Sequence, residues 1–309
     1  MRSSFISERL SLDFISALQN DDIAALRLVP KSDLHNHGIY GGSREFTAKR
    51  LGAKLDFPSV YGGISGMIRW ADANIKPHYQ SYQGVLLFFE SAFTQAAADG
   101  VAVLEMSLDA RYPGLYGRSA EEMARDICRL HIETARHIEF RLELGLNRMY
   151  AVEELSRLLD ECLETGLFKS VDLYGDEAAR PAGEFREIFS SAGRSGLKLK
   201  AHAGESGTAD DVVRAVEELN LSSVQHGIAA AASKEAMKFL AERRIALNVC
   251  PESNISLGYS SDYALHQIRV LFDHGVRVTV NTDDALLFGS GVSEQFLALY
   301  QSGAFSAEE

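Results

Sequence analysis

Cysteine is scarce in this chain. Only Cys128, Cys162 and Cys250 occur among 309 residues, and no C-x-x-C pair is present. An odd number of widely spaced cysteines argues against a disulfide framework and against a cysteine-ligated zinc site. Long apolar runs are also missing, and charged residues interrupt residues 1–30, so neither a signal peptide nor a membrane-spanning segment is expected. We therefore expect a reducing, cytoplasmic setting without contact to a membrane.

Positive charge is in short supply as well. Lysine and arginine number 31 against 43 aspartates and glutamates, which gives a net charge of −12 and a pI of about 5.3. A protein that follows a nucleic-acid backbone needs a basic face that displaces counterions, so we do not expect nucleic acid as a partner. This charge does not exclude a small nucleobase-like substrate, because recognition of such a molecule is local.

From residue 101 onward, short apolar strands alternate with segments of helical periodicity. The expected strands cover residues 101–108, 140–146, 168–173, 197–202, 223–226, 245–250 and 276–281. The helices between and after them are expected over 120–137, 152–164, 183–192, 210–219, 234–243, 263–274 and 293–300. With a first strand over 31–37, these make eight parallel βα units, which close into a (β/α)8 TIM-type barrel of the α/β class. An open doubly wound sheet is the alternative, but it does not require eight repeats.

We expect one domain over residues 1–309, because no linker or low-complexity segment divides the chain. Residues 1–30 are expected to form a helical lead-in, with apolar positions at helical spacing over 14–28. Residues 38–100 contain glycine-punctuated segments and a helical run over 85–98. They predict a helical insertion after the first strand, near the mouth of the active site.

Histidine and acidic residues gather where the expected strands end. In a barrel of this type the carboxyl ends of the strands form one rim, and the active site lies there. The clusters are His35 and His37 on strand one, His202 and Glu205 on strand five, His226 on strand six, and Asp283 and Asp284 on strand eight. His35 and His37 are two residues apart on a strand, so their side chains face the same way and can bind one divalent cation. The coincidence of four such clusters predicts a metal site.

The donor set suits a catalytic zinc, which takes three protein imidazoles and a carboxylate and leaves a position for water. We expect His35, His37, His202 and Asp283 to bind one Zn²⁺. Zinc lowers the pKa of its bound water toward neutrality. The remaining three residues would lie beside the metal. Glu205 comes three positions after a ligand, and His226 and Asp284 would orient and deprotonate the bound water.

One ion is expected, because a second usually needs a bridging group from strand four, and Lys169 lies at the wrong end of that strand. The other histidines lie in helical or loop sequence and are interpreted as ordinary surface or core residues, namely His78, His131, His137, His266 and His274.

The motifs themselves resemble those of the adenosine deaminase family in the amidohydrolase superfamily. They are His35-Asn36-His37, His202-Ala203-Gly204-Glu205, His226-Gly227 and Asn281-Thr282-Asp283-Asp284, with further matches at Pro30-Lys31, at 171–177 and at 250–254. The resemblance spans residues 30 to about 300. It implies zinc-dependent hydrolytic deamination of a 6-aminopurine nucleoside, with adenosine converted to inosine and ammonia as the first candidate.

The resemblance also implies roles around the purine. Glu205 would protonate or hydrogen-bond ring N1, His226 and Asp284 would accept the proton of the attacking water, and Asp284 would also contact the substrate. The backbone N–H of Gly175 would meet the purine, since glycine permits close approach. The residues support this chemistry independently, because an aromatic amidine carbon is a poor electrophile until its neighbouring nitrogen is protonated.

Some positions depart from the family pattern. Members that bind adenosine usually carry an aspartate two residues after the second histidine of strand one, where this chain has Ile39. Ser43, Arg44 or Tyr40 would then contact a different substituent of the purine. Tyr174 stands where a small residue is common. The chain also stops at Glu309, where relatives continue with more helix.

Other functions stay open at this point. The same chemistry on adenine, a modified adenosine or AMP is one alternative, since Arg44, Lys49 and Arg50 near the mouth could bind phosphate. Another amidohydrolase, cleaving an ester or amide, would not need the acid Glu205. An inactive metal-binding barrel is disfavoured, because every expected catalytic position is filled. The sequence does not indicate a protein partner.

Overall fold

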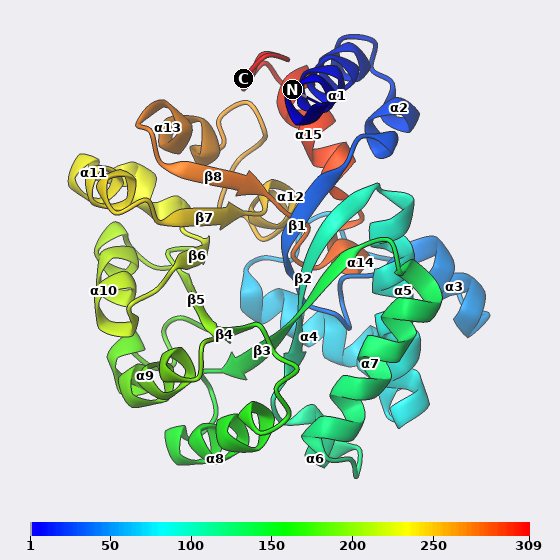
Figure 1. The fold of residues 1–309 in the computed structure, drawn as a ribbon, viewed down its shortest axis with the longest axis vertical. Helices are drawn as coiled ribbons and strands as arrows, with labels where there is room; N and C mark the ends of the chain where they lie inside the picture. The colour runs from blue at the N-terminus through cyan, green and yellow to red at the C-terminus, as the bar shows by residue number, and fades with distance from the viewer. Residues whose placement is uncertain (1) are drawn as a thin grey trace.

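The computed structural model describes residues 2–309, with side chains from Glu8 onward, and confirms the expected barrel. Eight parallel strands neighbour one another in chain order, from β1 to β8 (Figure 1). Their bounds are β1 Lys31–Asn36, β2 Val101–Asp109, β3 Glu139–Asn147, β4 Ser170–Tyr174, β5 Lys198–Ala203, β6 Ser223–His226, β7 Ala246–Val249 and β8 Arg277–Val280. Every expected strand is present, with small shifts at the ends.

Helices cover the outside of this barrel, and Figure 1 shows α8 to α11 and α13 around the strands. One helix of each βα unit lies outside the strands: α5 Tyr82–Ala98, α7 Ala120–Ala135, α8 Val152–Leu163, α9 Arg186–Arg194, α10 Ala209–Leu219, α11 Lys234–Glu242, α13 Gln267–Asp273 and α15 Val292–Gln301. The helix expected over 263–274 begins later, at Gln267. The reason is a cap, since the His266 side chain accepts a hydrogen bond of 3.1 Å from the N–H of Ile268.

The insertion between β1 and β2 is helical, as expected, with α3 Arg44–Leu51, α4 Ile64–Asn74 and η1 Lys76–Tyr79 before α5. The lead-in forms α1 Arg2–Gln19 and α2 Ile23–Leu28, which lie beside α15 (Figure 1). In the described chain, no helix combines the length and the apolar character needed to cross a bilayer. Four short helices in the loops were not expected, because four to six residues are too few for a hydrophobic period to repeat: α6 Tyr112–Leu115, η3 Ile228–Ala232, α12 Pro251–Ser256 and α14 Ala285–Phe288. The helix expected over 183–192 begins with the 3-10 turn η2 Ala182–Phe185, which continues into α9.

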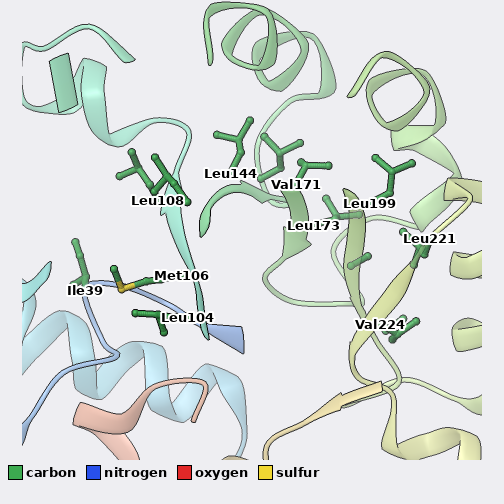
Figure 2. Close-up of a cluster of buried hydrophobic side chains, with 14 of the residues drawn as sticks. Ile39, Leu104, Met106, Leu108, Leu144, Val171, Leu173, Leu199, Leu221 and Val224 are labelled. Atoms are coloured by element: carbon green, nitrogen blue, oxygen red, sulfur yellow. The ribbon is translucent and has the colours of Figure 1, made fainter. Parts of the chain in front are cut away.

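The strands place apolar and polar side chains on opposite faces. Figure 2 shows Leu144, Val171 and Leu199 pointing from their strands toward the surrounding helices, within the hydrophobic core. Neighbouring positions, such as Glu143 between Leu142 and Leu144, face the barrel axis instead. The apolar core of this protein therefore lies between strands and helices, and the inside of the barrel is polar.

A buried lysine organises the polar interior below the rim. Lys200 Nζ, from a side chain 1% exposed, lies 2.6 Å from Glu105 Oε2 and 2.5 Å from Glu143 Oε2. It also donates to the Leu34 carbonyl at 3.0 Å, so its three N–H groups all find acceptors. Burial lowers the pKa of Lys200, but the two carboxylates more than offset this and raise the pKa above its ordinary value. Most TIM barrels fill this space with branched apolar side chains, so a charged layer is unusual.

The seam between β1 and β8 closes at the ends of the strands. Within the described residues, one isolated bridge joins Asn36 to Asp283. The N–H of His37 donates to the Asp283 carbonyl at 3.1 Å, and the N–H of Asp283 donates to the His35 carbonyl at 2.9 Å. Below this point a side chain takes the place of a backbone acceptor between the two strands, since Asn281 Oδ1 accepts a hydrogen bond from the N–H of Leu34 at 2.8 Å. The barrel is thus joined at the level where the histidines lie.

The charged layer yields a stability prediction. Lys200→Met should lower the free energy of unfolding by about 3–5 kcal/mol, because it leaves two buried carboxylates without their cation. Lys198→Met is the matched control on the same strand, because Lys198 is 57% exposed and 3.6 Å from Glu105. The control should change stability by less than about 1 kcal/mol. Urea unfolding of both variants measures the difference, and equal losses would contradict a special role for Lys200.

Candidate metal and catalytic site

Three imidazoles meet at the carboxyl end of the barrel. The ring centroids of His35 and His37, at the end of β1, are 4.8 Å apart. The His202 ring from β5 lies 4.7 Å from that of His35 and 5.3 Å from that of His37. The structure therefore brings together the three histidines that the sequence singled out.

The carboxylate of Asp283 joins this cluster from the end of β8. Its Oδ1 lies 3.2 Å from His35 Nε2 and 3.3 Å from His37 Nε2, and its Oδ2 accepts a 2.6 Å hydrogen bond from Ser253 Oγ. One donor atom from each of His35, His37, His202 and Asp283 lies within 4.8 Å of the others. One cation can span donor atoms at such separations.

Two of the imidazoles are oriented through their other ring nitrogen. His202 Nδ1 lies 3.2 Å from Asp172 Oδ2, and His37 Nδ1 lies 3.2 Å from Ser107 Oγ. Burial raises the pKa of Asp172, but His202 more than offsets this, and the pKa is lowered overall. A carboxylate behind a histidine fixes the ring orientation and makes the opposite nitrogen a better metal ligand.

The electrostatics of the cluster fit a bound cation. Neither ring nitrogen of His35, which is 1% exposed, has a hydrogen-bond partner. Burial lowers the pKa of His37, yet Asp283 and Asp284 more than offset this and raise the pKa to about 10. The carboxylates around His37 thus favour a positive charge at this point of the site. Orphaned buried nitrogens beside such a carboxylate are what a divalent cation would satisfy.

Two overlapping groups share His35 but suit a metal less well. One includes His226 and Cys250. Burial raises the pKa of the Cys250 thiol well above its usual range, whereas the thiolate is the form that binds metal. The other includes Glu143, whose charge is already met by Lys200. Among the described residues, the set of three imidazoles and Asp283 is the best cation site.

An acid and a base lie next to this set. Burial raises the pKa of Glu205 well above its usual range, and Asp283 and Glu177 add to the effect. Burial lowers the pKa of His226 well below its usual value, and its Nδ1 lies 3.5 Å from Glu205 Oε1 and 3.1 Å from the Asn254 amide nitrogen. A carboxyl with a raised pKa therefore lies beside an imidazole with a lowered pKa, a pairing that can move protons in both directions.

Asp284 is the second carboxyl after β8. Burial raises its pKa well above the usual range, followed by the charge of Asp283, and its Oδ1 has no hydrogen-bond partner. The side chain lines the same cavity as Glu205, so a ligand can meet both groups.

A cavity of about 510 Å³ opens over these groups, a size typical of small-molecule sites. Gly175, Ile39, Glu205 and Asp284 line it, together with a wall of tyrosines, namely Tyr40, Tyr79, Tyr112, Tyr116, Tyr150 and Tyr174. Lys76 is its single lysine or arginine in the described chain, and it pairs with Asp72 at 2.9 Å. The cavity therefore presents aromatic and hydroxyl groups and no unpaired basic side chain.

Several residues that hold the site were not singled out for a role from the sequence. Asp172 could have been found from the alternation along β4, because a charged residue between buried Val171 and Leu173 must face the barrel interior. Ser253 and Asn254 lie in the matched segment 250–254, but no pattern in the sequence indicates that they contact Asp283 and His226, which they reach through the short helix α12. His78, His131, His137, His266 and His274 lie outside the site, as expected.

Comparison with known proteins identifies the family of this chain. A family model described as adenosine deaminase matches residues 68–309. A putative adenosine/adenine deaminase of Treponema pallidum is 34% identical over 278 residues, which cover 90% of this chain and 93% of that protein. The chain belongs to the adenosine deaminase family. The resemblance drawn from the motifs is confirmed, and the protein is a hydrolytic deaminase that acts on a carbon–nitrogen bond.

Solved structures agree on the fold of this adenosine deaminase family member. An adenine deaminase from Arthrobacter aurescens superposes with a TM-score of 0.80 at 24% identity, covering 90% of this chain and 89% of that one. An amidohydrolase from Burkholderia ambifaria with bound zinc gives a TM-score of 0.77 at 22% identity, covering 91% and 82% of the two chains. At these identities, the likeness supports the barrel architecture alone.

Metal content tests the cluster. We expect His35→Ala and Asp283→Ala to lower bound metal from about one ion per chain to below about one-tenth, because each removes a donor that nothing nearby replaces. His131→Ala is the control, since His131 Nε2 lies 2.9 Å from the Ile138 carbonyl, away from the cluster. Elemental analysis of folded protein gives the readout. Full metal content in either site variant would show that the ion is held elsewhere.

Proposed function

We propose that this protein is a zinc-dependent aminohydrolase that removes the 6-amino group of an uncharged aminopurine, with adenosine, converted to inosine and ammonia, as the first candidate. The observation that carries the proposal is the buried carboxyl of Glu205, whose pKa burial raises well above its usual range, beside a cation site of three imidazoles and Asp283. An ester or amide hydrolase would have no use for an acid in that position, because water attacks a carbonyl without protonation of a ring nitrogen.

His35, His37, His202 and Asp283 are the proposed ligands. Imidazole with one carboxylate is a donor set that zinc favours, and the amidohydrolase of Burkholderia ambifaria with the same fold contains zinc. A zinc ion there would supply the Lewis acidity that brings the pKa of water toward neutrality.

The remaining steps belong to the side chains of this protein. Glu205 gives a proton or a strong hydrogen bond to ring N1, which makes C6 electrophilic. Neutral His226 takes the proton of the attacking water, and Asp284 orients that water and contacts the purine. The backbone N–H of Gly175 is the proposed contact on the ring edge. Gly175 has φ +97°, and a Cβ there would lie 2.7 Å from Asn147 Oδ1, so only glycine fits.

Adenine is the second candidate, and Ile39 is the observation that favours it. This side chain is 4% exposed and lines the cavity where the family pattern has a ribose-contacting aspartate. The similar proteins of Treponema pallidum and Arthrobacter aurescens are described as acting on adenosine/adenine and on adenine. The size of the cavity favours a ligand larger than adenine, so adenosine remains the first candidate substrate.

AMP fits less well than either, because Arg44, Lys49 and Arg50 do not line the cavity, and the two arginines contact other parts of the protein. Arg44 donates to the carbonyls of Leu286 and Leu287, and its guanidinium lies 4.1 Å from the centre of the Phe57 ring. Arg50 pairs with Glu90 at 2.9 Å. A phosphate in the cavity would meet Asp284 and Asp109 without an unpaired cation.

A substrate panel tests this proposal. Zinc-loaded protein is assayed with adenosine, adenine and AMP, following the purine absorbance change and released ammonia. We expect adenosine or adenine to exceed AMP in kcat/KM by about 100-fold, because an unpaired phosphate costs several kcal/mol on burial. No ammonia from any aminopurine would refute the proposal, and AMP as the best substrate would refute the assignment to uncharged purines.

The role of Glu205 gives a separate prediction. Glu205→Gln keeps the shape of the side chain but removes its acidic proton, so kcat should fall by about 10²–10⁴-fold while the metal content stays unchanged. Loss of metal in this variant would move Glu205 into the ligand set. Ester hydrolysis at the rate of the parent in Glu205→Gln would favour the alternative amidohydrolase function.

A further inference from the structure

The carboxylate of Glu177 occupies a concave turn in the loop that carries Glu205. The N–H of Gly204 donates to Glu177 Oε2 at 2.7 Å, and the N–H groups of Glu205 and Ser206 donate to Oε1 at 2.9 and 3.0 Å. Successive backbone N–H groups that converge in this way form an anion-binding nest. Here the anion comes from the protein itself, from the loop after β4.

Two glycines let the loop wrap around this carboxylate. Gly204 has φ +69°, and a Cβ there would lie 2.3 Å from Val212 Cγ2. A Cβ at Gly207 would lie 2.9 Å from Glu177 Oε2. The turn therefore closes tightly on Glu177 at Gly207, whereas Gly204 supplies the left-handed backbone conformation and fits against Val212.

A buried arginine ties the same two loops together. Arg148, from the loop after β3, donates through Nη2 to the His202 carbonyl at 2.6 Å. Its Nη1 lies 3.5 Å from the Glu177 carbonyl oxygen and 3.4 Å from that of Arg180. The end of β5 and the loop of Glu177 are thus held against one another by two independent contacts.

We propose that Glu177 is a positioning residue of the deamination reaction, which fixes the backbone from which Glu205 reaches the substrate. This inference rests on the proposed function. Glu177 does not line the cavity, so it acts through Glu205 and not by contact with the purine. Displacement of a reacting group by about 1 Å can cost about 100-fold in rate, so a loosened nest affects turnover before it affects the fold.

The variant Glu177→Gln tests this in the full-length, zinc-loaded protein. Glutamine has the same shape, but its NH₂ group cannot accept a hydrogen bond, so at least one of the three N–H groups loses its acceptor. We expect kcat to fall by about 10–100-fold with KM within about threefold and metal content unchanged. Hydrogen exchange of the amides of Gly204, Glu205 and Ser206 should become about tenfold faster.

Glu184→Gln is the matched control, since it removes the same charge from the same connecting loop. Glu184 pairs with Arg180 at 3.0 Å on the surface, and the variant should keep both the exchange rates and kcat. If Glu177→Gln fails to fold, Glu177→Asp replaces it, because the carboxylate is kept but is one methylene too short, and the same changes should appear in smaller degree.

The outcomes separate the two proposals. Unchanged kcat in Glu177→Gln, or unchanged amide exchange, would overturn the positioning role, as would equal effects in Glu184→Gln. If the zinc-loaded parent releases no ammonia from any aminopurine, the proposed function fails. The exchange result then still decides whether Glu177 holds the loop of Glu205.

Discussion

The first and last strands of the barrel, β1 and β8, meet at Asp283, and the histidines of the cation site lie around its carboxylate. The backbone of Asp283 exchanges hydrogen bonds with His35 and His37 across the seam of β1 and β8, and its side chain lies against the same two imidazoles. Closing the barrel and assembling the cation site are therefore one structural event. Asp283 has φ +59°, a conformation that costs an L-residue about 1–3 kcal/mol and persists only where its surroundings impose it.

The interior beneath this junction is organised to support it. Because Lys200 lies two residues before His202 on β5, the charged layer and the candidate ligand share one strand and one face. The apolar burial that drives folding is kept on the other face, between strands and helices. The apolar core and the polar residues of the site thus lie on opposite faces of the strands, so polar residues can occupy the barrel axis without interrupting the apolar packing.

The sequence predicted those features that follow from period and topology. Eight strands were visible from apolar alternation, and His35, His202 and Asp283 could be brought together because parallel strands end on one rim. Features that depend on a distant partner were not predictable. The availability of Arg44 for phosphate depends on carbonyls of Leu286 and Leu287, more than 240 residues away. The contacts of Ser253 likewise depend on α12, a helix too short for a hydrophobic period to repeat, and the start of α13 depends on the cap at His266.

The pKa values of Asp283 and Glu205 are shifted in opposite directions for identifiable reasons. Asp283 lies among imidazoles, which lower its pKa well below the usual range although it is buried. Glu205 has no such partner of comparable strength, so burial dominates and raises its pKa, and the charge of Asp283 comes second. The division of labour between a metal-binding carboxylate and an acid therefore follows from where the fold places each group, Asp283 among imidazoles and Glu205 in a buried position without such a partner.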